Sequence, residues 1–110
     1  MLKTYLILIA ATIFEVSGTM LLPVTKGFTK PVPTGALIFF YVCAFFCLSI
    51  VVTKLPLAVV YATWSGLGIF TIAILGYVFF KQTLNWQTIL GLFFIIIGVI
   101  LVNSYNLKSI

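Results

Sequence analysis

The chain has 110 residues, of which 64% are hydrophobic and only 6% are charged, far below the charged fraction of a soluble domain. Six lysines against one acid give a net charge of +5, but the lysines are scattered singly and do not form the basic face of a nucleic-acid-binding protein. With one acid and no histidine, the chain lacks a Ser-His-Asp set and the ligands for a metal site. The composition predicts a membrane protein that is not an enzyme and has no cofactor, metal or nucleic-acid partner.

Four apolar segments each approach the roughly 20 residues that a helix needs to cross the hydrocarbon core of a bilayer. They cover residues 4–22, 34–53, 57–80 and 87–103. Lys3 before the first segment resembles the start of a signal peptide, but no A-x-A-like cleavage site follows, so we interpret this segment as a retained span. The longest connection, 23–33, contains three prolines and a glycine that break helices. The sequence predicts an all-α membrane protein in which residues 1–110 form a single four-helix transmembrane domain.

The first span contains Glu15, the only Asp or Glu in the chain. Glu15 lies about 16 Å along a helix that begins with the span, which places it near the bilayer midplane. A carboxylate at that depth is costly and usually faces a bundle interior or a water-filled cavity. Because every lysine lies at a span end or in a loop, we expect a proton or a visiting cation to neutralise Glu15.

The helical neighbours of Glu15 are mostly small or carry hydroxyl groups. At helical spacing from the carboxylate they are Ala11, Thr12, Gly18 and Thr19, with Leu8 one turn further back. This face predicts room for a ligand beside the acid.

The second span brings Tyr41 to the same predicted depth and contains Cys43 and Cys47, which share a helical face. A disulfide between them would close no useful loop, so we predict that both are small apolar packing residues.

The third span contains "YATWSGLG", residues 61–68, in which two aromatic residues and a hydroxyl lie on one helical face. The residues of this face are Tyr61, Trp64, Ser65 and Gly68. Aromatic residues within a span usually serve packing, but their faces attract cations, more strongly away from water. With Glu15 in the same bundle, this face predicts a cation site. Gly66 and Gly68 leave two interpretations open, a bend in the helix or close packing against a neighbouring helix.

The fourth span carries Gly91 and Gly98, seven residues apart on one side of the helix. The resulting small-residue groove predicts association with another helix and makes this span a candidate dimer interface.

The lysines give no preferred orientation. If the chain crosses the membrane four times, one side carries Lys3, Lys54 and Lys108, and the other carries Lys26, Lys30 and Lys81. A chain without this bias can insert both ways, and two oppositely inserted copies can form an antiparallel dimer, the two-chain counterpart of an inverted repeat. A balance of few lysines by chance is the alternative.

Taken together, these motifs resemble the small multidrug resistance family of bacterial inner-membrane exporters. The resemblance covers nearly the whole chain and rests on "EVSGT" around Glu15, "KGFTK" in the first loop, "LPLAVVYATWSGLG" entering the third span and the paired glycines of the fourth. It implies a multi-pass protein of the inner membrane that works as an antiparallel homodimer and uses proton influx to export hydrophobic cations.

The resemblance also implies roles for particular residues. Glu15 would be the shared proton and substrate site, Trp64, Tyr61 and Tyr41 would contact the substrate, Gly66 and Gly68 would form a bend, and the fourth helices would hold the dimer together. Gly18 and Thr19 make the chain look more like the quaternary-ammonium exporters than the guanidinium exporters of the family.

Pro23 and Lys26 depart from the family pattern, in which many members have Lys and an acid at these positions. Several alternatives stay open: a guanidinium or polyamine exporter, a non-transporting membrane subunit, a lipid-carrier flippase subunit, and a heterodimer with a paralogue.

Overall fold

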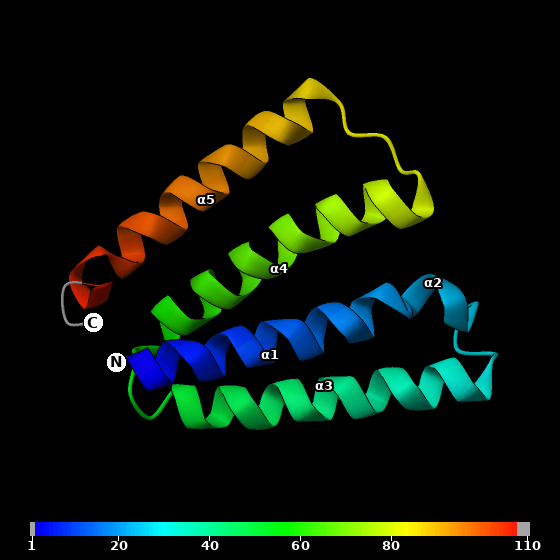
Figure 1. The fold of residues 1–110 in the computed structure, drawn as a ribbon, viewed down its shortest axis with the longest axis horizontal. Helices are drawn as coiled ribbons and strands as arrows, with labels where there is room; N and C mark the ends of the chain where they lie inside the picture. Colours follow the sequence, from blue (N-terminus) through cyan, green and yellow to red (C-terminus); the bar gives the residue numbers. More distant parts are fainter. Residues whose placement is uncertain (1, 108–110) are drawn as a thin grey trace.

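A computed structural model describes residues 2–107 of the chain, and within this range it contains helices and connecting turns but no strand. The helices are α1 (Leu2–Met20), α2 (Leu22–Thr25), α3 (Pro31–Val51), α4 (Leu57–Phe80) and α5 (Trp86–Leu107) (Figure 1). With α1 and α2 taken together, they provide four apolar helices long enough to cross a membrane. The predicted all-α membrane fold is confirmed.

The prolines of the first connection begin helices where the sequence predicted a loop over 23–33. Pro23 lies in the first turn of the short α2, and Pro31 is the first residue of α3. A proline is tolerated there because its missing N–H would have no partner in the first turn of a helix in any case. The chain reverses in the remaining segment, where Lys26, Gly27 and Phe28 all have positive φ angles.

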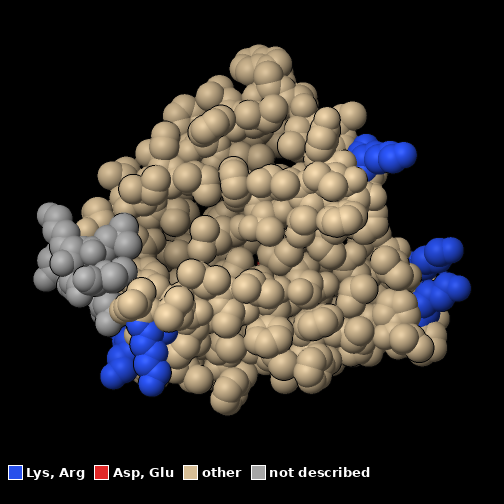
Figure 2. Space-filling model, in the orientation of Figure 1, with Lys and Arg blue, Asp and Glu red and all other residues tan. Residues whose placement is uncertain are grey.

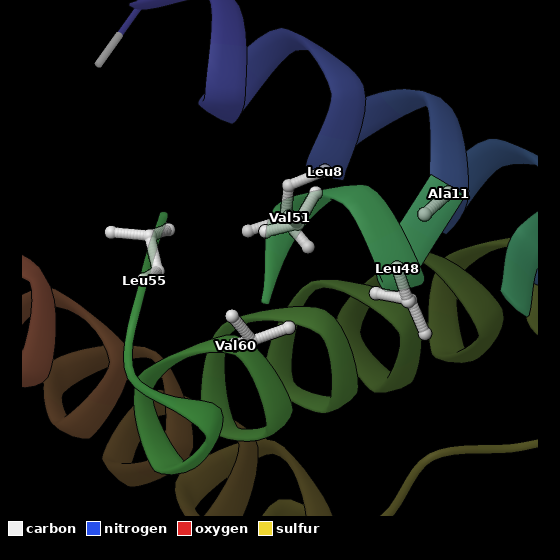
Figure 3. Packing of buried hydrophobic residues seen from close by; sticks show 6 residues of the cluster. All are labelled: Leu8, Ala11, Leu48, Val51, Leu55 and Val60. Atoms are coloured by element: carbon white, nitrogen blue, oxygen red, sulfur yellow. The ribbon is translucent and has the colours of Figure 1, made fainter. Parts of the chain in front are cut away.

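Helix α1 lies between α3 and α4, and α5 packs along the other side of α4 (Figure 1). The buried apolar cluster gathers at the end of the molecule where α1 begins and α3 connects to α4 (Figure 3). Its members are Leu8, Ala11, Leu48, Val51, Leu55 and Val60. Because lipid tails are as apolar as leucine, close van der Waals packing, more than exclusion from water, holds these helices together.

The outer surface of the helices suits a hydrocarbon environment. Large apolar side chains such as Phe39, Phe79 and Phe94 are exposed on three different helices. The lysines gather at the two opposite ends of the molecule, and the visible surface between them carries no charge (Figure 2). Lys108, which was predicted to lie on one side of the membrane, is outside the described residues.

Helix α4 runs unbroken through both of its central glycines, and α5 packs against Gly66. A β-carbon at Gly66 would overlap Val99 Cγ2 and stand 3.5 Å from Ile95 Cγ2. Gly66 is therefore a packing residue in this conformation. Gly91 and Gly98 have open space instead, since a β-carbon at either would meet no atom within 4 Å.

We expect Gly66→Ala to lower the free energy of unfolding by about 1–3 kcal/mol, because the added methyl group overlaps the Val99 side chain. Denaturant unfolding in detergent, followed by circular dichroism, measures this change. Gly35→Ala is the matched control, because Gly35 is also helical, in α3, and a β-carbon there would meet no atom within 4 Å. Val99→Ala should restore part of the stability lost in Gly66→Ala, and additive losses would contradict the packing explanation.

Candidate functional site

A cavity of about 450 Å³ lies between α1, α4 and α5, with the Glu15 side chain in its wall. Its lining residues are Glu15, Thr19, Trp64, Ser65, Gly68, Ile69, Ile72, Ala73, Thr88 and Leu92. The volume lies in the range of small-molecule sites, and the wall is mostly apolar with a few polar groups, as such sites usually are.

One oxygen of Glu15 ends a chain of hydrogen bonds from two helices. Thr19, one turn further along α1, donates to Glu15 Oε1 at 2.8 Å. The Tyr41 hydroxyl of α3 lies 2.7 Å from Thr19 Oγ1. Because a threonine hydroxyl has one hydrogen, and that hydrogen points to the carboxylate, Tyr41 is the donor to Thr19. The order of donation is therefore Tyr41 to Thr19 to Glu15.

The second oxygen, Glu15 Oε2, is buried and has no hydrogen-bond partner among the described residues. It lies over Gly68 of α4, where a β-carbon would stand 3.0 Å from it. The indole Nε1 of Trp64, in the wall of the same cavity, is likewise buried without a partner among them. Buried polar atoms are nearly always paired because an unpaired one is costly, so two exceptions beside one cavity mark it as a candidate ligand site.

Several of the predicted site residues come together here. Glu15, Thr19, Trp64, Ser65 and Gly68 share the cavity wall, although they come from two helices separated by a third in the chain. Tyr41 joins them through its hydrogen bond to Thr19.

The remaining residues predicted on the face of Glu15 lie elsewhere. Leu8 and Ala11 are fully buried in the apolar cluster, and Thr12 bonds to its own helix while bordering a second cavity beside α1 and α4. Gly18 packs beneath Tyr41, since a β-carbon there would be 2.8 Å from the tyrosine ring. Of the small neighbours of Glu15 on α1, only Thr19 therefore lines the cavity, where Gly68 of α4 lies beside the carboxylate.

Tyr61 is 66% exposed and does not line the cavity of Glu15. Its ring meets Trp64 edge to face, with centroids 6.1 Å apart, and both residues border a third cavity of about 300 Å³ together with Phe45. Trp64 thus separates two spaces, one containing the carboxylate and one lined by aromatic rings.

Some lining residues were not predicted. Ile69, Ile72 and Ala73 continue the helical face of Trp64 and Ser65, so extending that face by two turns would have found them. Thr88 and Leu92 come from α5, and the sequence offers no signal for which face of α5 turns toward α4.

Four helices long and apolar enough to span a membrane, with a half-buried acid beside a cavity between three of them, indicate a multi-pass membrane protein. A family profile described as Small Multidrug Resistance protein matches residues 3–95. The chain belongs to the small multidrug resistance family, which confirms the predicted class, a multi-pass bacterial membrane protein of multidrug efflux.

Several relatives match nearly their full length. Quaternary ammonium compound-resistance protein QacG of Staphylococcus sp. (strain ST94) is 40% identical over 103 residues, covering 93% of this chain and 95% of the relative. Multidrug resistance protein EbrB of Bacillus licheniformis is 38% identical over 108 residues, covering 98% and 91%. The uncharacterized membrane protein YvaE of Bacillus subtilis (strain 168) is 36% identical over 99 residues, covering 90% and 83%.

We expect Thr19→Val to shift the infrared carboxyl band of Glu15, because valine keeps the volume of threonine but cannot donate to Oε1. Difference spectra against Glu15→Gln identify that band, since Glu15 is the only side-chain carboxyl group in the chain. Thr19→Ser retains a hydroxyl and should leave the band near its original position. The same band position in the valine variant and in the unsubstituted protein would contradict the hydrogen bond from Thr19 to Glu15.

Proposed function

We propose that this chain exchanges protons for hydrophobic organic cations, quaternary ammonium compounds among them, across the bacterial inner membrane. The observation that carries the proposal is the carboxylate of Glu15, which has one oxygen held by Thr19 and the other buried, without a partner among the described residues, beside a cavity. An acid in this position is stabilised by any species that brings it a positive charge or a proton.

A proton and an organic cation compete for the same group. When Glu15 carries a proton it is neutral and has no charge to attract a cation, and when a cation pairs with the carboxylate the proton has left. If each species can reach Glu15 from either side in turn, this competition becomes exchange, because a site that has lost one is ready for the other. The chemistry of coupling therefore needs no second acid in the chain.

The walls of the cavity favour large, weakly hydrated cations. Apart from Glu15, Thr19, Ser65 and Thr88, the cavity is lined by Trp64, one glycine and aliphatic side chains. The indole can stabilise a cation through its face, and apolar groups on the ligand can lie against the aliphatic wall. A hydrated inorganic ion needs several oxygen ligands, which this wall does not provide. This lining favours quaternary ammonium compounds over the smaller and more polar guanidinium.

We further propose that the working unit is an antiparallel homodimer. A β-carbon at Gly91 or Gly98 of α5 would meet no atom within 4 Å, and this open space suits close approach by another helix. The near balance of lysines at the two ends allows insertion in both orientations. Two opposed copies would give the exchange two equivalent states that open to opposite sides.

We expect Glu15→Gln to abolish both binding of tetraphenylphosphonium and the proton release that accompanies it, because glutamine keeps the shape of the side chain but cannot be charged. Isothermal titration in buffers of different ionisation enthalpy measures both quantities in one experiment. Ser17→Ala is a suitable control, because the Ser17 hydroxyl bonds to its own helix at Ile13. Undiminished binding by Glu15→Gln would refute the shared site, and a protein that binds no cation at all would favour a non-transporting subunit.

We expect Trp64→Ala to weaken tetraphenylphosphonium about tenfold and guanidinium much less, because the indole contributes a cation–π contact and apolar area that a small cation does not use. Competition binding with both cations measures the ratio. Trp64→Phe retains an aromatic face and should recover most of the lost affinity. Equal weakening of both cations would point to misfolding of the site and not to loss of a specific contact.

A further inference from the structure

A second polar group lies buried at the other end of the bundle, away from the Glu15 cavity. Asn103 of α5 is 4% exposed, and its Nδ2 donates to Thr63 Oγ1 of α4 at 2.6 Å and to the Val99 carbonyl at 2.9 Å. Its Oδ1 accepts a hydrogen bond from the Tyr5 hydroxyl of α1. We call Tyr5, Thr63 and Asn103 the terminal clasp.

The terminal clasp is fully paired. Both hydrogens of the Asn103 amide are used, its oxygen accepts from Tyr5, and the Thr63 hydroxyl donates in turn to the Val59 carbonyl at 2.7 Å. In this respect it differs from the Glu15 site, where one carboxylate oxygen and one indole N–H are left over among the described residues. Because every donor is used and every polar atom has a partner, we interpret the clasp as a structural contact between helices.

The terminal clasp joins α1 and α5, two helices that otherwise make little contact. Helices α1 and α5 each pack along α4, but they share no extensive contact within residues 2–107, and the bond from Tyr5 to Asn103 links them across 98 positions of the chain. The ribbons of α1, α4 and α5 come together at this end, near the N-terminus (Figure 1). The first turns of α5, at the opposite end of the molecule, lie far from α1.

The clasp and the buried apolar cluster close the same side of the cavity. Leu8 and Val60, of the cluster, precede Glu15 and Trp64 in their helices, at the end where Tyr5 and Asn103 meet. The cavity extends the opposite way, toward Ala73 late in α4 and Thr88 at the start of α5. In this conformation the clasp and the cluster lie between Glu15 and the end of the bundle at which the chain begins.

We infer that the terminal clasp is the gate on that side, and that it must part whenever Glu15 becomes accessible there. This inference rests on the proposed exchange, in which the carboxylate meets the two sides in turn. Thr63 directly precedes Trp64 in α4, so a movement that withdraws Thr63 from Asn103 also moves the indole in the cavity wall. In an antiparallel dimer the two clasps lie on opposite sides of the membrane, and one is closed while the other is open.

A gate of this kind prevents protons from crossing when no cation is carried. With the clasp weakened, the gated side opens while the other side is still accessible, and Glu15 passes protons down their gradient without exchange. A hydrogen bond between membrane helices contributes enough that its loss should raise the substrate-free proton leak about threefold to tenfold.

The test compares Thr63→Val, Tyr5→Phe and Asn103→Leu in liposomes with an imposed pH gradient and no organic cation. We expect all three to leak protons faster than the original protein while tetraphenylphosphonium binding is retained. Thr71→Val is the matched control, because Thr71 is also on α4 and its hydroxyl bonds to Leu67 of the same helix. If Asn103→Leu does not fold, the other two variants, which preserve side-chain volume, still decide the question.

Hydrogen exchange gives a readout that does not depend on transport. Amides of residues 99–104 should exchange faster in the clasp variants and at the original rate in Thr71→Val. Adding Thr63→Val to Asn103→Leu should cause little further change, because both remove one link. Unchanged amide hydrogen exchange in the clasp variants, together with no increase in their proton leak, would overturn the clasp. A loss of cation binding as large as in Glu15→Gln would also overturn it. If the unsubstituted protein binds no cation, the proposed proton–cation exchange is refuted. The clasp is still tested in that case, because amide hydrogen exchange at residues 99–104 does not depend on transport.

Discussion

Inside a bilayer, a polar group can find a partner only within the protein, and this constraint orders the whole structure. Most hydroxyl groups of the spans have their hydrogen-bond partner in the same helix. Thr12, Ser17 and Thr71, for example, each donate to the carbonyl four residues earlier. These bonds do not restrict how the helices move relative to one another, because each bond lies within a single helix. Hydrogen bonds between side chains of different helices, in contrast, fix one arrangement.

Among the side chains that the structure describes, two polar clusters join different helices, and they differ in how completely their polar atoms are paired. The Asn103 cluster uses every hydrogen-bond donor it contains. The Glu15 cluster is satisfied on one side, through Thr19 and Tyr41, and left open at Oε2 and at the Trp64 indole as far as the described residues go. Burial alone does not distinguish these two clusters. The completeness of pairing does, because only an unpaired group gains from the arrival of a ligand.

Hydropathy was sufficient to predict the four apolar helices, and the count of acids was sufficient to single out Glu15, because both signals are local to the sequence. The helix starts at Leu22, just before Pro23, and at Pro31 were missed, since the sequence alone does not say whether a proline ends one helix or begins the next. Helical periodicity also grouped residues by face without saying what each face meets. The room beside Glu15 was therefore assigned to small residues of its own helix, of which only Thr19 lines the cavity, and Gly68 of α4 was not assigned to it.

The contact between Gly18 and Tyr41 has a consequence for how selectivity can change during evolution. The tyrosine ring occupies the place where any larger side chain at position 18 would have to go. Tyr41 also begins the chain of donors that ends on Glu15. A replacement at position 18 therefore cannot be judged by itself, because it moves the ring and, through it, the hydroxyl on which Thr19 depends. Homologous sequences that differ at positions 18 and 41 should therefore differ at both. A protein with only one of the two replacements should function poorly.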